Sequence, residues 1–429
     1  MNEEHRLTTL ESGTRIVTEE MPSVRSVSLG FWVGTGSRAE TDEQAGLSHL
    51  LEHLLFKGSE KYGSLEIDQI FDGMGAELNA GTGKETTSVY ARVIDSHLEP
   101  AFDVMADIVF RPLLNDLDSE RAVILEEIAM YEDDPQEKVF DVLGEAVFGS
   151  HPLGRAIIGR AEVVAGAPES EIVAFHQERY APANIVIAAA GAVTHDQLVE
   201  LARARVPVAR GAQAPGWVPA PDGAPRRIRF EEKDTEQYHV CVGGPGISRH
   251  DDRRFALRVL DTIFGGTSSS RLFQEVRERR GLAYAVYSFT SHYQDSGQVG
   301  LYVGTRAENL GEAAAVVGAE LARLQEDPAT PDELTRAKEN LKGRVLLALE
   351  STGARMNRLG SEVLGDSPLL PLDEVVARID AVELDDLRAL AQELWSPARL
   401  SAAGIGPGEA AFRDAVGAIE PDLVEPARR

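Results

Sequence analysis

The chain has 429 residues, more than one hydrophobic core usually supports, so we expect two domains of roughly 200 residues each. Its 43% hydrophobic and 26% charged residues exclude a disordered chain, and no apolar run is long enough to span a membrane. A formal net charge of −27 argues against nucleic acid as a partner, because phosphate binding needs a basic surface. The need for solubility is enough to explain the excess of acidic residues, although a preference of the protein for basic peptides as substrates is a second interpretation.

The start of the chain and its cysteine content predict a cytoplasmic protein. The opening residues, MNEEHRLTTLESG, lack the basic start and apolar run of a secretory signal. The single cysteine, Cys241, cannot form an internal disulfide, which fits a reducing compartment. In the context YHVCVGG it is expected to be a small buried strand residue.

The first element that carries chemistry is a helix around residues 49–53, which read HLLEH. On a helix, His49 and His53 project from one face one turn apart, so both imidazoles can reach a single metal ion. Glu52 lies beside them, where its carboxylate can act as a general base without binding the metal. A catalytic zinc needs a third protein ligand and an open position. The alternative is an ordinary helix whose histidines are satisfied by hydrogen bonds.

The best source of a third ligand is the helix predicted over 118–132. Glu120 and Glu127 are seven residues apart and share the face that carries apolar residues, whereas Glu126 is expected to face water. A carboxylate buried without a partner is costly, and a metal ion is a good partner. The alternative is two solvated acids on a surface helix.

Residues 207–225 hold five of the chain's 21 prolines and show no helix or strand periodicity, which predicts an interdomain linker. The halves on either side, 1–206 and 226–429, repeat the same patterns. The segment VAFHQERYAPANIVIAAAGAV is matched by RALAQELWSPARLSAAGIGPG, and LLEHLLFKGS by LRVLDTIFGGTSSS. Each half mixes antiparallel strand pairs with long helices such as 118–132 and 307–326. We therefore expect an α+β fold of two homologous domains from a tandem duplication.

With these residues the sequence resembles a known family, the pitrilysin-type (inverzincin) zinc metallopeptidases. The family motif is H-x-x-E-H with a later glutamate, and Glu127 lies 74 positions after His53. The stretches HLLEHLLFKGS, MGAELNAGTGKETT and VILEEIAMYEDDP look most like the mitochondrial processing peptidase branch and its bacterial relatives. The resemblance implies one Zn²⁺ per chain held by His49, His53 and Glu127. It also implies that Glu52 is the general base and that Glu120 supports the site.

The resemblance assigns further residues outside the motif. Asn79 and Ala80 match an edge strand that pairs with the substrate backbone. Arg277 and Tyr284, in VRERRGLAYAVYS, match residues that reach across to the zinc, where they could stabilise an oxyanion. Without the resemblance, Arg277 would be an exposed helix charge and Tyr284 a core aromatic of a strand.

The activity implied is that of a zinc-dependent endopeptidase that hydrolyses extended or unfolded peptides, with two chains paired as a homodimer. The alternative is a non-catalytic scaffold or partner subunit, since the family includes members that have lost the site. A degenerate subunit would lack at least one residue of the motif, and none is missing here.

The repeat supplies an internal comparison between the halves. Aligning Phe56 with Phe264 places Leu257, Leu260 and Asp261 opposite His49, Glu52 and His53. Aligning Glu120 with Glu333 places Asn340 opposite Glu127. The second half therefore has the scaffold without the metal, and we expect it to close a chamber against the first half. Residues 1–206 alone are then expected to bind zinc yet hydrolyse peptides poorly.

Overall fold

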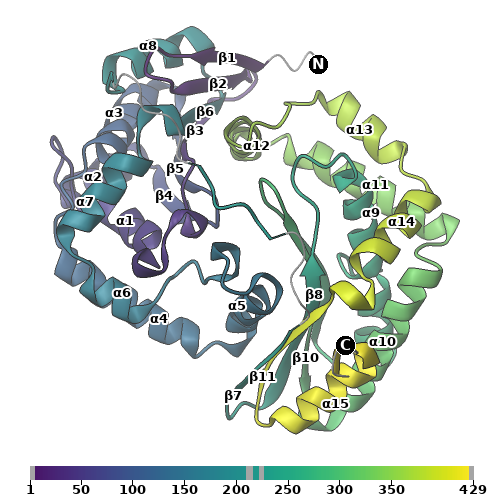
Figure 1. The fold of residues 1–429 in the computed structure, drawn as a ribbon. Coiled ribbons are helices and arrows are strands. Elements are labelled where there is room, and N and C mark those ends of the chain that lie inside the picture. The colour runs from purple at the N-terminus through teal and green to yellow at the C-terminus, as the bar shows by residue number, and fades with distance from the viewer. Residues whose placement is uncertain (1–4, 209–215, 222–226, 425–429) are drawn as a thin grey trace. The chain divides into compact units, whose positions relative to one another are not determined.

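The computed structural model describes residues 5–208, 216–221 and 227–424 and divides the chain into two compact units (Figure 1). Residues 209–215 and 222–225 of the predicted linker lie outside the described residues. The first unit comprises Met1–Ile128, Ala156–Val218 and Val345–Leu372, and the second comprises Ala129–Arg155, Pro219–Arg344 and Asp373–Arg429. Among the helices described, none is both long and apolar enough to cross a membrane.

The first unit is built on a six-stranded sheet in the order β1-β2-β6-β3-β5-β4. Only β2 and β6 pair in parallel, and the other neighbours are antiparallel. The strands are β1 (His5–Thr9), β2 (Arg15–Glu20), β3 (Ser26–Val33), β4 (Glu77–Thr82), β5 (Thr87–Ile94) and β6 (Ile185–Gly191). The helices are α1 (Leu47–Leu55), α2 (Ser64–Met74), α3 (Leu98–Phe110), α6 (Ala161–Gly166), α7 (Glu169–Arg179), α8 (His195–Arg205) and α12 (Thr352–Leu364).

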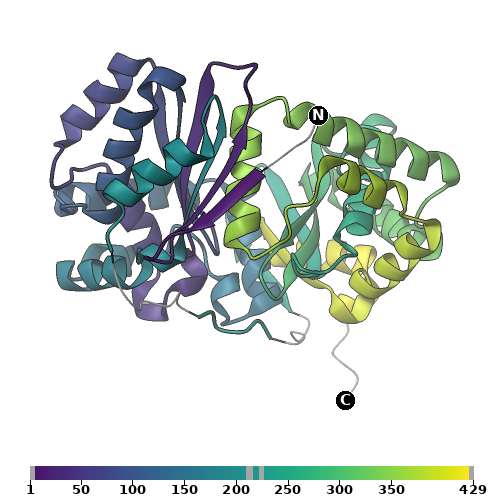
Figure 2. The ribbon, with the colours of Figure 1, turned by 90° about the horizontal axis from the view of Figure 1, so that it is seen from above.

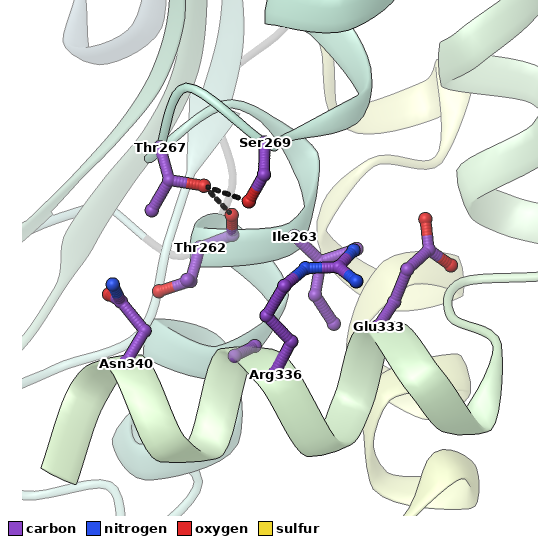
Figure 3. A pocket seen from close by; sticks show the side chains of 8 residues that line it. Thr262, Ile263, Thr267, Ser269, Glu333, Arg336 and Asn340 are labelled. Carbon is purple, nitrogen blue, oxygen red and sulfur yellow. Dashed lines mark hydrogen bonds between the residues drawn. The ribbon is translucent and has the colours of Figure 1, made fainter.

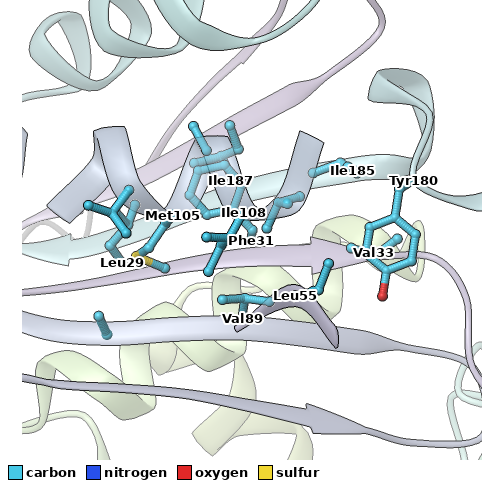
Figure 4. Close-up of a cluster of buried hydrophobic side chains, with 14 of the residues drawn as sticks. Leu29, Phe31, Val33, Leu55, Val89, Met105, Ile108, Tyr180, Ile185 and Ile187 are labelled. Carbon is cyan, nitrogen blue, oxygen red and sulfur yellow. The ribbon is translucent and has the colours of Figure 1, made fainter. Parts of the chain in front are cut away.

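One face of this sheet carries the core that supports α1. Figure 4 shows Phe31 of β3 and Ile187 of β6 beside Ile108 of α3 and Leu55 of α1, all fully buried. The strand side chains alternate between faces with a period of two, so β6, which reads IVIAAAG, presents apolar residues on both sides. Such a strand needs cover on both faces of the sheet.

Helix α12 covers the second face. Met356 and Leu359 of α12 pack on Val17 of β2 and on Val186 and Ala188 of β6. Both ribbon views show α12 beside these strands (Figures 1 and 2). This helix comes from the far side of the linker in the sequence, so the first sheet is completed by the second half of the chain.

The second unit is built on a five-stranded sheet in the order β7-β11-β8-β10-β9, with only β7 and β11 parallel. Its strands are β7 (Ile228–Glu232), β8 (Gln237–Pro245), β9 (Ala285–His292), β10 (Gly297–Arg306) and β11 (Ser401–Gly406). Its helices are α5 (Pro135–Phe148), α9 (Arg254–Phe264), α10 (Leu310–Glu326), α13 (Leu372–Asp380), α14 (Leu384–Leu394), α15 (Glu409–Ile419) and α16 (Pro421–Val424). Two helices continue from one unit into the other, α4 (Leu117–Glu132) and α11 (Pro331–Ala348).

The two sheets have the same strand order once β1 is set aside, because β2-β6-β3-β5-β4 corresponds element by element to β7-β11-β8-β10-β9. The predicted α+β fold of two homologous units is thereby confirmed. The buried position predicted for Cys241, on β8, is also found.

The unit boundaries differ from the predicted 1–206 and 226–429 by a reciprocal exchange of helices. Helix α5 comes from the first half but packs on β8 and β11 of the second unit, where Val139 and Leu143 lie in one buried cluster with Cys241 and Ala403. Conversely, helix α12 comes from the second half of the chain but packs on the sheet of the first unit. The repeats in the sequence indicate which segments are homologous, but not which sheet each helix covers.

Candidate metal centre

Helix α1 positions His49, Glu52 and His53, and its start is fixed by Gly46 and Glu40. Gly46 has a left-handed backbone with φ of 107°, which favours glycine. The buried Glu40 carboxylate accepts hydrogen bonds from the backbone nitrogens of Gly46 at 2.9 Å and Ser48 at 2.7 Å. These bonds satisfy amide groups that a helix leaves without intrahelical partners, so the first turn of α1 is firmly held.

The structure brings His49, His53 and Glu127 together. The Oε2 atom of Glu127, on α4, lies 3.7 Å from Nε2 of His49 and 3.6 Å from Nε2 of His53. Ligand atoms of the three residues all lie within 4.8 Å of one another. In tetrahedral zinc with bonds of about 2.0–2.2 Å, ligand atoms are about 3.4 Å apart. The spacing therefore fits one small metal ion, and no other such group of three occurs in the part of the chain that the structure describes.

The hydrogen bonding of His49 does not fit an ordinary helical histidine. Its Nδ1 is buried and has no hydrogen-bond partner among the described residues, and 3.7 Å from Nε2 to Glu127 is too long for a hydrogen bond. Burial lowers the pKa of His49, and His53 lowers it further, although Glu127 opposes the shift. A neutral imidazole whose Nε2 faces Glu127 and makes no hydrogen bond among the described residues can bind a metal through that atom.

Glu120, which is paired with Lys57, holds the Nδ1 side of the His53 ring. The buried Glu120 carboxylate lies 3.3 Å from Nδ1 of His53 and 2.8 Å from Nζ of Lys57. Because a carboxylate can only accept, Nδ1 of His53 donates and Nε2 is left for the side facing Glu127. The sequence reasoning missed Lys57, although it follows His53 by one helical turn, a spacing that could have indicated it. Glu126 is exposed, as expected.

Glu52 is held by the end of strand β4. The hydroxyl of Thr82 donates a hydrogen bond to Oε2 of Glu52. Asn79 and Ala80 lie on the same strand, paired with Tyr90 and Val89 of β5. β4 is the outermost strand at this end of the sheet, and no described strand pairs with its outer edge. Thr82 was not predicted as a site residue, since only the fold reveals its contact with Glu52.

Arg277 and Tyr284 belong to the second unit and lie together there. The Arg277 guanidinium is 4.3 Å from the centroid of the Tyr284 ring, and its Nη1 donates to the Tyr284 carbonyl at 3.0 Å. The Tyr284 side chain is not in the core but is 78% exposed. An exposed phenol beside a guanidinium is available to a ligand, which a buried aromatic of a strand would not be.

Comparison with known families identifies both halves of the chain. Residues 15–161 match the family model described as insulinase (peptidase family M16), and residues 169–341 match the peptidase M16 inactive domain. Proteins named uncharacterized zinc protease are similar over nearly the whole chain. One from Streptomyces coelicolor is 43% identical and covers 94% of this chain and 89% of its own length. One from Bacillus subtilis is 40% identical and covers 90% of this chain and 95% of its own.

Solved structures match the fold. A peptidase M16 inactive domain from Pseudomonas fluorescens has a TM-score of 0.88 at 23% identity, covering 95% of this chain and 99% of that chain. A protease from Helicobacter pylori has a TM-score of 0.88 at 22% identity, covering 94% of this chain and 100% of that chain. At these identities the likeness establishes the fold alone.

Proposed function

Because the chain belongs to peptidase family M16, the pitrilysin-like zinc proteases, we propose that it is a zinc-dependent endopeptidase that hydrolyses extended or unfolded peptides. The observation that carries this proposal is the grouping of His49, His53 and Glu127 beside a carboxylate that is not a ligand. Three protein ligands with an open position are typical of catalytic rather than structural zinc sites. Glu127 remains 46% exposed, so the group is accessible to water and substrate.

The residues have separate roles in this proposal. His49, His53 and Glu127 hold one Zn²⁺ per chain, which when bound supplies a Lewis acid for the peptide carbonyl and acidifies water. Glu52 takes a proton from the attacking water and later returns it to the leaving amine. Thr82 orients the Glu52 carboxylate, since its hydroxyl donates to one of the two oxygens.

Substrate recognition is assigned to the edge of β4. The outer edge of an unpaired strand offers backbone donors and acceptors to an extended peptide, and Asn79 and Ala80 lie in its middle. A folded protein cannot present an extended backbone there without local unfolding. We assign Arg277 and Tyr284 as donors from the second unit to the developing oxyanion, as the family resemblance implies.

The second candidate function is a non-catalytic partner subunit, since the family includes a domain described as inactive. The complete set of His49, Glu52, His53 and Glu127 favours the enzyme. Assembly as a homodimer and a cytoplasmic location complete the proposal. Sedimentation of the purified protein and cell fractionation test these two points separately from the chemistry.

The decisive experiment combines metal analysis with peptide hydrolysis for the protein and its Glu52→Gln variant. We expect about one zinc per chain in both, and loss of most activity in Glu52→Gln, because the base is removed and the ligands are kept. Glu126→Gln, an exposed neighbour of the ligand Glu127, is the matched control and should stay fully active. Zinc binding without hydrolysis of any peptide in a mixed library would favour the partner subunit. Wild-type turnover in Glu52→Gln would refute the proposed role of this residue.

A further inference from the structure

The second unit contains a cavity beside α11 that the proposed peptidase chemistry does not use. The cavity measures about 610 Å³ and is lined by side chains that include Ser270, Arg271, Arg279, Arg323 and Arg336. Its size is within the range of about 300–1,000 Å³ typical of small-molecule sites. The lining holds four guanidinium groups against two carboxylates, Glu275 and Glu333, which is a local excess of positive charge in a chain whose net charge is −27.

A smaller pocket adjoins this cavity along the same helix (Figure 3). Glu333, Arg336 and Asn340 reach it from one face of α11, and Thr267 and Ser269 reach it from the loop that follows α9. The two hollows share Ser269, Glu333 and Arg336. Together they form a groove rich in hydroxyl groups and guanidinium groups.

Most of the lining charges are already paired within the protein, and Arg323 lies 3.7 Å from Glu320. Arg271 donates to both oxygens of Glu333 at 2.9 and 2.8 Å, which satisfies that carboxylate. Glu275 forms ion pairs with two arginines, Arg279 and Arg280. Its single negative charge can neutralise only one of the two positive charges. The lining as a whole therefore keeps an excess of positive charge.

Two further groups have no partner within the described residues. The guanidinium of Arg336 makes no hydrogen bond or ion pair there, although it lines both hollows. Ser270 is 1% exposed and lines the larger cavity, and its hydroxyl oxygen is buried without a hydrogen-bond partner. A buried hydroxyl without a partner is costly, and a ligand oxygen would satisfy it.

The internal repeat relates this groove to the metal centre. In the alignment of the repeats, Glu333 corresponds to Glu120 and Asn340 to the metal ligand Glu127, so α11 lines the groove with residues at the positions that α4 gives to the metal centre. In α11, an arginine, Arg336, stands where α4 has Val123. Helix α11 thus has an amide at the position of the metal ligand and, four residues earlier, an arginine at the position of a valine.

We propose that this groove binds the phosphate group of a small molecule, with Arg336 and Ser270 as direct contacts. A carboxylate has two oxygens in one plane, whereas a phosphate presents three or more and can accept from several guanidinium and hydroxyl donors at once. The groove offers more guanidinium and hydroxyl donors than the two oxygens of a carboxylate can accept from, which favours phosphate as the ligand. The proposal is independent of peptide hydrolysis, because it concerns binding in the second unit alone.

Calorimetric titration of the whole zinc-loaded protein with inorganic phosphate tests the proposal, at an ionic strength kept constant with sodium chloride. We expect saturable binding that weakens about tenfold or more in Arg336→Gln, because a charge-assisted hydrogen bond is lost. Arg336→Lys should recover part of the affinity, and Ser270→Ala should weaken it less. The matched control is Arg306→Gln, an exposed arginine of the same unit outside both hollows, which should bind phosphate as the wild type does.

The same titrations separate the alternatives. Phosphate could also bind at the zinc, but that binding would be unchanged in Arg336→Gln, and such a result overturns the proposal. Tighter binding of acetate than of phosphate at equal ionic strength overturns the choice of phosphate. No binding of phosphate beyond that of chloride overturns the site altogether. Circular dichroism of each variant confirms that a loss of affinity is not a loss of fold.

Discussion

Helix α12 belongs to the second half of the sequence but completes the first sheet, so we expect residues 1–206 made alone to fail as a stable zinc-binding domain. This prediction reverses the expectation from the sequence, in which the first half would bind zinc by itself. Without Val345–Leu372, one face of β2, β3 and β6 would be left in water. The metal ligands of α1 lie on the other face, and they depend on the same sheet for support.

The size of the effect follows from the side chains that α12 buries. Met356, Leu359 and Val363 are 2%, 1% and 7% exposed. At about 1.5–3 kcal/mol for each buried side chain, their loss removes about 5–9 kcal/mol, against a total stability of about 5–15 kcal/mol for a typical protein. Arg355 also forms an ion pair with the buried Glu19, and removing one member of such a pair costs about 3–5 kcal/mol more. The losses are therefore as large as the stability that the unit would have.

Urea unfolding followed by near-ultraviolet circular dichroism, together with zinc analysis, measures this effect. In the full chain, Leu359→Ala should lower the free energy of unfolding by about 2–5 kcal/mol. Leu347→Ala, at a position that is 68% exposed, should change it by less than about 0.5 kcal/mol. Fusing residues 345–372 to residues 1–206 through a flexible linker should restore folding and zinc binding. Cooperative unfolding and one zinc per chain in residues 1–206 alone would refute the reasoning.

Three further predictions concern the site. Thr82→Val should lower turnover about ten- to a hundredfold with zinc content unchanged, since a hydrogen bond to a charged group is worth about 1.5–3 kcal/mol, and Thr82→Ser should retain activity. Steady-state kinetics checks this, and an equal loss in Ser88→Ala, a neighbouring strand hydroxyl, would contradict a specific role. Glu120→Gln should weaken zinc about 10–100-fold in competition with a chelator, because His53 loses its carboxylate partner. Tyr284→Phe should lower turnover about a hundredfold at unchanged metal content, and wild-type rates would exclude it as an oxyanion donor.

The local parts of the site could be predicted because helix geometry is local. His49 and His53 are four residues apart, and any regular helix puts both on one face. The repeated strand patterns likewise predicted two homologous α+β units, because alternation and turn residues act over a few positions. The predicted helix over 307–326 begins at Leu310, since residues 307–309 form a 3₁₀ turn that leads into it.

What could not be predicted depends on contacts between distant segments. The contact between Thr82 and Glu52 joins the end of β4 to α1, and no periodicity in either segment indicates it. Strand β6 is apolar on both faces, which shows that the sheet is covered on both sides without identifying the cover. Either half of the chain could have supplied the helix that covers the second face of this sheet. The exchange of α5 and α12 was therefore not predictable from the sequence patterns.

The exchange of helices also sets the order in which the protein can fold as it is synthesised. Strand β6 ends at Gly191, but α12 ends only at Leu364. At about 5–20 residues per second, the ribosome needs on the order of ten to thirty seconds to reach the end of α12. During this time α12 cannot yet cover the apolar face of β2 and β6, so that face stays open in the nascent chain. The first unit can complete its core only after most of the second has been made.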